Sequence, residues 1–491
     1  MQKIVITSVP YTDTTAPIMA PAVLKGIADK AGYDSYAFDL NAIVHKEMLK
    51  HPQRIDIQEF FYYGKTKSGL SKEIDRLFKS MTKLIVEHDP DIVCLSLLHY
   101  QCQITARWLC YHIKKHNKNI KIVIGGSGIG NEGLSIFQDN YPKQLKKLNL
   151  IDHFIVGDGE TAFYELLTGN LNFKGVDSLG WNQIDDLEKL PYPNYDNYDF
   201  SLYKSPFIGL VGSRGCVRKC TFCDVHEYWT KFNWRSAESI FQEMLYQNKK
   251  HGCRTFKFHD SLINGNVKEY NKLVALLSSH NQSNPNNSLS WSSFFIFRPV
   301  EQMSEEVWKN TAASGAANLI VGVENLVEKN RLHLKKNFDN AALDHGLAMA
   351  KKYNINLILL IIIGYVTETE EDHKESLQWF YDHREYAGNP VVQVSMGTTL
   401  QIIPGTYLDR NQKELGVTWL KKDGNMVTGK DELWEIKSTG NNYETRQRRA
   451  REMVEAAQKA GFNTTWRYGV IENQKGVEQL IADQMNKFRI D

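Results

Sequence analysis

The stretch Cys216-Val-Arg-Lys-Cys220-Thr-Phe-Cys223 follows an apolar run, Phe207 to Val211, and a turn that contains Gly212 and Gly215. Three thiolates so close in sequence can hold one metal centre. Three are too few for a closed four-ligand site, so an iron–sulfur cube held this way keeps one iron open for an exogenous ligand. His226 follows the third cysteine, and the local motif alone therefore also allows a closed Cys₃His zinc site or unliganded core cysteines.

This cysteine motif resembles that of the radical S-adenosylmethionine superfamily, in which an aromatic residue such as Phe222 typically precedes the third cysteine. In that superfamily the open iron chelates the methionine part of S-adenosylmethionine and reduces the cofactor to an adenosyl radical. The resemblance implies that Cys216, Cys220 and Cys223 hold a 4Fe-4S cluster. It also implies that the chain binds S-adenosylmethionine with Phe222 at the cofactor site.

Length and composition narrow the function classes. A chain of 491 residues predicts two or three domains, and 59 basic against 57 acidic residues do not indicate a polyanionic partner. The basic run 446–451 favours a solvated helix face over a nucleic-acid site. The longest apolar run, 357–363, is too short to span a bilayer, and no hydrophobic signal begins the chain. Three cysteines assigned to a metal favour a cytoplasmic protein, with small core residues expected at Cys94, Cys102, Cys110 and Cys253.

Residues 1–168 alternate strand and helix signals. Strands separated by amphipathic helices predict a doubly wound parallel sheet with helices on both faces. Such sheets bind ligands at the carboxyl ends of their strands. The expected strands are 4–9, 35–40, 92–98, 120–126 and 153–157.

The strand ends of this domain carry a second resemblance. Ser96-x-Leu98 followed by Gly125-Gly126 resembles the cobalamin-binding domain family, in which the serine meets the nucleotide tail and the glycines let the backbone approach it. The turn 157–160 extends the resemblance to the N-terminal domain of cobalamin-binding radical enzymes. The Asp-x-His-x-x-Gly motif is absent, so cobalamin would bind without a histidine on cobalt. The alternative is a domain that keeps the fold and has lost the cofactor. The implied cobalamin contacts are Ser96, Leu98, Gly125, Gly126, Ser127, Gly157 and Glu160.

A polar, proline-punctuated linker is expected at 169–205, and strand and helix signals alternate again over 206–410. Six βα units predict a partial (β/α)₆ TIM-type barrel, whose chemistry lies at the carboxyl ends of the strands. Residues 411–491 are expected to form a helical C-terminal domain with a helix over 443–460. The barrel strands are expected at 207–212, 255–260, 289–297, 318–324, 357–364 and 391–400.

Chemistry-bearing residues follow the predicted barrel strands. Asp260 and Ser261 resemble the position at which a polar group meets the cofactor's ammonium, and Glu324 resembles the strand-four carboxylate that contacts the methionyl or ribose part. Ile363-Gly364 resembles the strand-five motif that packs on adenine through its backbone. Arg298 is expected to contact the cofactor, and the alternative is that it pairs with Glu301. The alternative role for Glu324 is to cap the helix that follows. The implied S-adenosylmethionine contacts are Phe222, Asp260, Ser261, Arg298, Glu324, Ile363 and Gly364.

These patterns together predict a radical S-adenosylmethionine enzyme with a cobalamin-type N-terminal domain. The resemblance implies methyl transfer to an unactivated carbon of a small molecule or peptide, with flavodoxin or ferredoxin as reductant, and no membrane or nucleic-acid partner. A radical rearrangement or cyclisation without methyl transfer is the enzyme alternative. A zinc-binding regulatory or scaffold protein is the alternative of another class.

Overall fold

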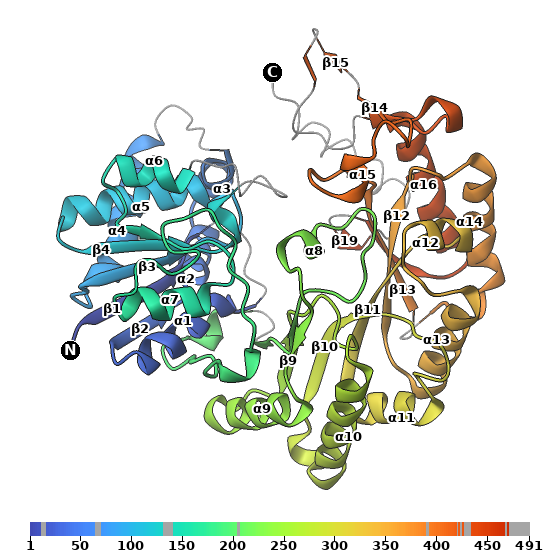
Figure 1. The fold of residues 1–491 in the computed structure, drawn as a ribbon, viewed down its shortest axis with the longest axis horizontal. Helices are drawn as coiled ribbons and strands as arrows, with labels where there is room; N and C mark the ends of the chain where they lie inside the picture. The colour runs from blue at the N-terminus through green and yellow to red at the C-terminus, as the bar shows by residue number, and fades with distance from the viewer. Residues whose placement is uncertain are drawn as a thin grey trace. The chain divides into compact units, whose positions relative to one another are not determined.

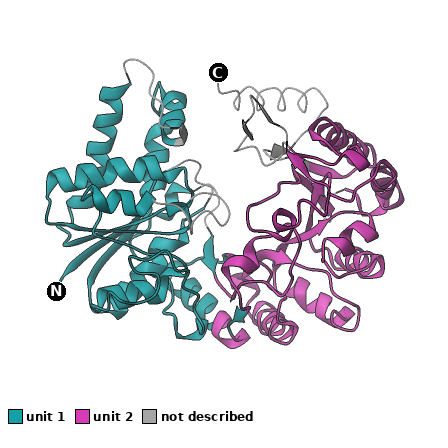
Figure 2. Cartoon of the chain, turned by 45° about the horizontal axis from the view of Figure 1, so that its top comes forward, with its two compact units in different colours: residues 1–210, 233–235, 242–256 teal, residues 211–232, 236–241, 257–491 magenta. Residues whose placement is uncertain are grey.

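Two mainly parallel sheets organise the chain (Figure 1). The computed structural model describes residues 1–10, 16–63, 70–130, 141–203, 207–388, 392–419, 421–422, 425–426, 434–466 and 469–470. The chain divides into two units (Figure 2). The first consists of residues 1–210, 233–235 and 242–256, and the second of residues 211–232, 236–241 and 257–491.

The sheet of the first unit has the order β2-β1-β3-β4-β5, and all of its pairings are parallel. Every residue of β3 is buried, as expected for a strand covered by helices on both faces. The five predicted strands are therefore confirmed. Their bounds are β1 (Lys3–Ser8), β2 (Asp34–Phe38), β3 (Ile92–Ser96), β4 (Lys121–Gly125) and β5 (His153–Phe154).

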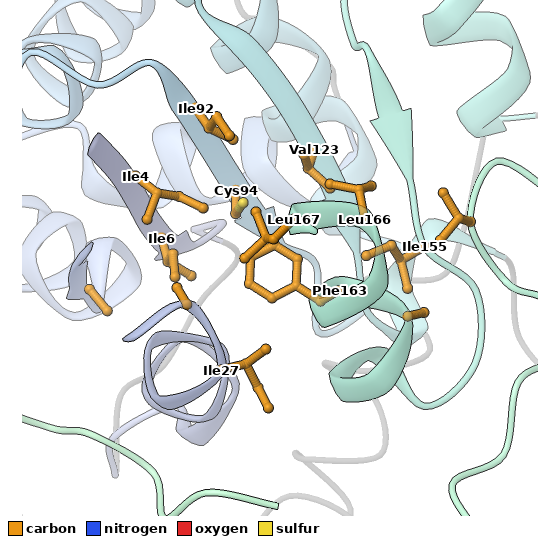
Figure 3. Close-up of a cluster of buried hydrophobic side chains, with 14 residues drawn as sticks. Ile4, Ile6, Ile27, Ile92, Cys94, Val123, Ile155, Phe163, Leu166 and Leu167 are labelled. Carbon is orange, nitrogen blue, oxygen red and sulfur yellow. The ribbon is translucent and has the colours of Figure 1, made fainter. Parts of the chain in front are cut away.

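One face of this sheet packs against α1 (Met19–Lys30) and α7 (Gly159–Leu167). Ile27 of α1 and Phe163 of α7 meet the strand residues Ile6 and Cys94 in a buried cluster (Figure 3). Cys94, Cys102 and Cys110 are buried, which confirms them as small core residues. The remaining helices are α2 (Leu40–Leu49), α3 (Arg54–Tyr63), α4 (Ser71–Val86), α5 (Cys102–His116) and α6 (Tyr141–Lys147).

Residues 169–203 of the predicted linker are described in the structure, and their tyrosines fasten the segment to the first unit. The buried Asp39 carboxylate, after β2, accepts hydrogen bonds from the Tyr203 hydroxyl at 2.9 Å and the Ser8 hydroxyl at 2.6 Å. Burial raises the pKa of Asp39, against these hydrogen bonds. The Tyr198 hydroxyl donates to the Ile18 carbonyl at 2.8 Å. Aromatic hydroxyls therefore hold this proline-rich segment where backbone pairing is sparse.

The second sheet has the order β19-β18-β13-β12-β11-β10-β9-β6. Its neighbouring strands from β10 to β18 pair in parallel. The six predicted barrel strands are confirmed as β6 (Ile208–Leu210), β9 (Thr255–Phe258), β10 (Ser290–Phe295), β11 (Ala316–Glu324), β12 (Leu357–Ile363) and β13 (Val392–Thr399). The connecting helices are α9 (Ala237–His251), α10 (Val267–Ser283), α11 (Glu305–Ala313), α12 (Glu328–His333), α13 (Asn340–Tyr353) and α14 (Glu370–Asp382).

The C-terminal segment contributes strands as well as a helix. The predicted helix is confirmed as α16 (Tyr443–Lys459), and the Asn442 side chain caps its first turn. The chain then adds β18 (Asn463–Trp466) in parallel to β13, followed by β19 (Gly469–Val470). These strands were not predicted, because Asn463-Thr-Thr-Trp466 carries no apolar alternation. None of the helices in the described ranges is long and apolar enough to cross a membrane.

The basic run 446–451 was predicted to form a solvated helix face, but two of its arginines are not solvated. Arg446 and Arg449 are fully buried. The Arg446 guanidinium lies 3.8 Å from the centre of the Trp434 ring and donates to the Trp434 carbonyl. Arg449 pairs with two glutamates near the start of α14. The expectation was wrong for these two arginines because Arg446 is satisfied by a ring face and a carbonyl oxygen and Arg449 is paired with carboxylates.

Candidate functional site

The three motif cysteines lie on one turn that follows β6 and β7 (Ser213–Arg214). All three are free thiols; Cys220 is buried, and Cys216 and Cys223 are partly exposed. The Arg218 amide donates to the Cys216 sulfur at 3.4 Å, and the Cys223 amide donates to the Cys220 carbonyl at 3.2 Å. Gly215 has φ +83°, and a Cβ there would lie 2.5 Å from the Lys231 carbonyl oxygen. This close approach requires glycine and keeps the turn tight.

The electrostatic surroundings of the turn suit an anionic centre. Burial raises the pKa of all three thiols, that of Cys223 to about 12. Lys336, Arg218 and Arg298 oppose this effect at Cys216, because cations favour the thiolate. Three thiols without disulfides, close to three cations, match the ligand set of a three-cysteine iron–sulfur cluster.

Two observations bear on the metal chemistry of this turn. Among the residues that the structure describes, no group of three or more His, Cys, Asp or Glu side chains is already arranged to hold a metal ion. The three cysteines therefore lie on one turn, but their sulfur atoms are not arranged around a common metal position. The His226 Nε2 atom lies 3.2 Å from a carboxylate oxygen of Glu227, which does not support a Cys₃His zinc set.

Asp260 follows β9 and is buried. Its carboxylate accepts from the Gly212 amide at 2.8 Å and from the Ser213 hydroxyl at 2.6 Å. Asp260 therefore ties the end of β9 to the segment that leads into the cysteine turn. Ser261 beside it is partly exposed. That these two residues meet the cofactor's ammonium stays a prediction.

Arg298 follows β10 and fastens a neighbouring loop. Its guanidinium donates to the Asn264 and Gly265 carbonyls at 2.8 and 3.0 Å, and to the Gln302 side chain at 3.3 Å. The alternative partner Glu301 is not among these contacts. Burial raises the pKa of Cys216, and the Arg298 charge opposes this rise, so the charge acts on the cysteine turn while the donors hold the loop after β9.

Glu324 ends β11 in a left-handed backbone conformation, φ +65°. A non-glycine residue there is uncommon and typical of functional sites. Its carboxylate lies 2.7 Å from the Lys336 ammonium. A Cβ at Gly322 would lie 2.4 Å from the carboxylate and 2.6 Å from the ammonium, so glycine makes room for the pair. The N-cap of α12 is Val327, without a side-chain cap, which does not support Glu324 as its cap.

Sequence reasoning missed Lys336. The residue lies in a segment where Lys335 and Asn337 both have left-handed backbones, φ +62° and +53°. Such a turn carries no glycine signal, and the sequence Lys335-Lys336 alone suggests solvated side chains. A buried lysine beside a carboxylate and near thiols belongs to the same site as Glu324.

The loop after β12 is held by the C-terminal segment. Gly364 has φ +76°, and a Cβ there would lie 2.3 Å from the Arg446 side chain. The Asn441 side chain donates to the Gly364 and Tyr365 carbonyls at 3.1 and 3.0 Å. Ile363 is buried at the strand end. These contacts set the backbone that is predicted to meet adenine.

One face of the second sheet is partly open along its length. Alternate residues of β10 to β13 are half-buried or exposed, whereas the residues between them are buried. Strand pairing places them in rows, with Phe294 opposite Ile320 and Gly322 opposite Leu360. The face is mainly apolar, and on β11 it leads to Glu324 at the strand end. It consists of Ser292, Phe294, Asn318, Ile320, Gly322, Ile358, Leu360, Ile362, Gln393 and Ser395.

The first unit brings most predicted cobalamin contacts together where β3 and β4 end. Ser96 pairs with Gly125, and the Ser127 hydroxyl donates to the Leu98 carbonyl at 2.6 Å. Leu98 and Tyr100 are 38% and 40% exposed at this edge. Two large side chains are therefore partly open to solvent at this edge.

Contacts within the protein explain why two of the three glycines at this edge are glycine. Gly126 has φ +96°, and a Cβ would lie 2.4 Å from the Leu97 carbonyl oxygen. Gly157 has φ +93°, and its Cβ would meet the Asn182 backbone at 2.4 Å. At Gly125 the nearest atom would be 3.6 Å away, so only this glycine of the three leaves room for a methyl group.

Glu160 has different neighbours from the predicted cobalamin contacts of β3 and β4. It is buried in the first turn of α7 and lines a cavity of about 350 Å³ with Lys30, Tyr164 and Phe173. The lining of this cavity contains none of the predicted contacts from β3 and β4. The structure therefore does not place Glu160 with Ser96 and Gly125 in one cavity.

Comparison with protein families matches residues 210–380 to the model of the radical SAM superfamily. Three curated relatives are similar over longer stretches. An uncharacterized methyltransferase of Pyrococcus horikoshii is 23% identical and covers 72% of this chain and 76% of its own. The cytidylyl-2-hydroxyethylphosphonate methyltransferase of Streptomyces wedmorensis is 22% identical, covering 74% and 72%. The anaerobic magnesium-protoporphyrin IX monomethyl ester cyclase of Synechocystis is 22% identical, covering 46% and 47%.

Two solved structures have the same arrangement of elements. The radical S-adenosylmethionine methyltransferase TsrM from Kitasatospora setae, with cobalamin and a [4Fe-4S] cluster bound, is 15% identical, with a TM-score of 0.64 over 86% of this chain and 82% of its own. The cobalamin-dependent radical enzyme OxsB with aqua-cobalamin bound is 14% identical, with a TM-score of 0.62 over 99% and 71%. These likenesses confirm the predicted fold.

Proposed function

We propose that this chain, whose residues 210–380 form a radical S-adenosylmethionine domain, is a cobalamin-dependent methyltransferase acting on an unactivated carbon. The observation that carries the proposal is the convergence of the cysteine turn, the Glu324–Lys336 pair and the loop after β12 at the carboxyl ends of parallel strands. Catalytic groups of barrel enzymes lie at this edge.

Each part of the site has a chemical role in this proposal. Cys216, Cys220 and Cys223 would hold the cluster, and the cations near Cys216 would offset its negative charge. When bound, the cluster supplies the electron that cleaves S-adenosylmethionine, and cobalamin supplies the methyl group that is transferred. Glu324 and the loop after β12 would bind and orient S-adenosylmethionine.

The open face of the second sheet supports a substrate with an apolar body. Phe294, Ile320 and Leu360 offer hydrocarbon contact on this face, where water is excluded when a ligand covers them. Gln393 and Ser395 add hydrogen-bonding groups on β13. A small molecule or a peptide side chain can meet these requirements, and we place the enzyme in the cytoplasm with flavodoxin or ferredoxin as reductant.

Cobalamin is supported by the partly exposed Leu98 and Tyr100 where β3 and β4 end, and methyl transfer is supported by the methyltransferase names of two relatives. One observation favours a second candidate. The strained glycines Gly126 and Gly157 are explained by contacts within the protein, so they do not require a ligand. A radical cyclisation or rearrangement without methyl transfer is therefore the second candidate, and one relative is named a cyclase.

The test uses anaerobically purified and reconstituted full-length protein. Wild type should bind about four irons per chain and form 5′-deoxyadenosine from S-adenosylmethionine under reduction. Cys220→Ala should retain about one iron or fewer, whereas Cys253→Ala, a free cysteine outside the turn, should match wild type. Bound zinc without iron would contradict the proposal. Cobalamin retained through gel filtration, carrying label from methyl-labelled S-adenosylmethionine, would separate methyl transfer from cyclisation.

A further inference from the structure

A tyrosine hydroxyl lies at the junction of three segments of the second unit. The Tyr365 hydroxyl is 2.8 Å from the Thr221 hydroxyl and 2.8 Å from the Nδ1 atom of His333. Tyr365 and Thr221 are both fully buried. A phenol hydroxyl can donate one hydrogen bond and accept others, so it can satisfy both partners at once.

Each partner belongs to a different part of the site. Thr221 lies between Cys220 and Phe222 in the cysteine turn, and Tyr365 directly follows Gly364 after β12. His333 ends α12, three residues before Lys336. One hydroxyl therefore connects the turn that carries the thiols with the loop after β12 and with the end of α12, close to Lys336.

Backbone contacts around Thr221 strengthen this connection. The Thr221 amide donates to the Leu334 carbonyl at 3.2 Å, and its carbonyl accepts from the Leu408 amide at 3.1 Å. Thr221 is thus anchored through its backbone and its side chain. Burial raises the pKa of Tyr365 well above its usual range, so the hydroxyl keeps its proton at any physiological pH.

We propose that Tyr365 is a positioning residue that fixes the cysteine turn against the loop after β12, so that the cluster and S-adenosylmethionine meet in one geometry. This inference rests on the proposed function, because it requires the cysteines to hold the cluster. The three thiols set where the cluster sits on the turn, and the orientation of the turn depends on noncovalent contacts. Displacement by about 1 Å between reacting groups can cost about a hundredfold in rate.

The chain offers a matched control. The Tyr270 hydroxyl lies 2.8 Å from the Thr311 hydroxyl, and both residues are buried. Tyr270 belongs to α10 and Thr311 to α11, so this pair has the same chemistry away from the cysteine turn. Tyr270→Phe removes the same kind of hydrogen bond as Tyr365→Phe, and a merely structural role predicts equal consequences for both.

The experiment compares reconstituted wild type, Tyr365→Phe and Tyr270→Phe. Iron content, the electron paramagnetic resonance spectrum of the reduced cluster with and without S-adenosylmethionine, and the rate of 5′-deoxyadenosine formation are measured. Tyr365→Phe should keep its iron, change the spectral response to S-adenosylmethionine and lose about 10- to 100-fold in rate. Tyr270→Phe should show the wild-type spectra and a rate within about twofold, even where its melting temperature falls equally.

A second pair of variants covers the case in which Tyr365→Phe fails to fold. Thr221→Ser keeps the hydroxyl and should behave as wild type, whereas Thr221→Val keeps the shape and should reproduce the spectral change. Wild-type spectra and rate in both Tyr365→Phe and Thr221→Val would overturn the inference, as would an equal spectral change in Tyr270→Phe. A wild-type chain that takes up no iron would overturn the proposed cluster first, which distinguishes the two failures.

Discussion

The Lys336 ammonium lies 2.7 Å from the Glu324 carboxylate, and each side chain is only 10% exposed. Burial alone would lower the pKa of Lys336, but Glu324 and Cys220 raise it above its usual value. The two charges therefore compensate each other in the ligand-free site. Any ammonium that binds Glu324 would have to share the carboxylate with Lys336, and any anion placed nearby would meet Lys336.

Glu324→Gln tests the carboxylate with little change in shape. We expect the variant to keep its iron, because the thiols are intact, and to lose at least about tenfold in affinity for S-adenosylmethionine, because a charge-assisted hydrogen bond is lost. Equilibrium dialysis with labelled S-adenosylmethionine measures the change. Glu328→Gln, a partly exposed glutamate at the start of α12, is the control. Unchanged affinity in Glu324→Gln would place the cofactor elsewhere.

Variants of the adjacent glycines Gly125 and Gly126 can distinguish a glycine that the fold requires from one that a ligand requires. Gly126→Ala should destabilise the first unit by about 1–3 kcal/mol without any cobalamin, because its φ is +96° and its Cβ would meet the Leu97 carbonyl. Gly125→Ala should change the stability by less than about 0.5 kcal/mol, because the nearest atom is 3.6 Å away. Urea unfolding of the apo-protein measures both.

Gly125→Ala is then the informative variant for cobalamin. If the backbone at Gly125 approaches the cofactor, the added methyl group should weaken cobalamin retention by about tenfold or more, read from the visible absorbance after gel filtration. Retention equal to that of wild type would contradict the predicted contact while leaving the fold intact. Loss of cobalamin in Gly126→Ala alone would indicate only that the domain is disturbed.

Local patterns predicted the sheets because several strands are largely apolar runs between glycines and polar turns. Ile92 to Ser96 and Leu357 to Ile363 are examples, and both are strands in the structure. The cysteine spacing located the candidate centre for the same reason, since its ligands are close in sequence. The strand ends then placed Asp260 and Glu324 at one edge.

The partners of those residues were not predictable from the sequence. Lys336 reaches Glu324 only through left-handed turns at non-glycine residues, and the Tyr365–Thr221 bond joins positions 144 residues apart. A pattern read over a short window contains neither. A motif can also be over-interpreted. Gly126 matches a ligand-binding motif, but its backbone conformation and its contact with Leu97 already require glycine.

Arg449 anchors α16 to the segment after β12 through one buried and one partly exposed carboxylate. Its guanidinium contacts the Glu368 carboxylate at 3.0 Å and the Glu370 carboxylate at 3.1 Å. Arg449→Met should destabilise the second unit by about 3–5 kcal/mol, because Glu368 would be left buried without its cation. Urea unfolding measures the change, with the exposed Arg451→Met on the same helix as control. The double variant with Glu368→Gln should recover part of the loss, and an Arg449→Met protein as stable as wild type would show that the pair contributes nothing.

Glu370 should contribute to the decrease in the free energy of unfolding at acidic pH. Hydrogen bonds from Arg448 and then Arg449 hold the pKa of Glu370 at about 2, against burial and well below its usual value near 4.5. Because the folded state has the lower pKa, the unfolded state binds more protons between these values, and the free energy of unfolding falls as the pH falls. The contribution of Glu370 is fully present above about pH 4.5 and is lost as the pH approaches about 2.

Glu370→Gln should therefore flatten this part of the profile. The carboxylate is 41% exposed, so solvent screens the interaction and the effect should be modest. Urea unfolding at about pH 5 and about pH 3 gives the difference, which should be smaller in Glu370→Gln than in wild type. Glu371→Gln, at the exposed neighbouring position, should keep more of the wild-type difference. An equal acid loss in wild type and Glu370→Gln would mean that other carboxyl groups dominate the acid limb and that the arginine contacts do not hold Glu370 ionised.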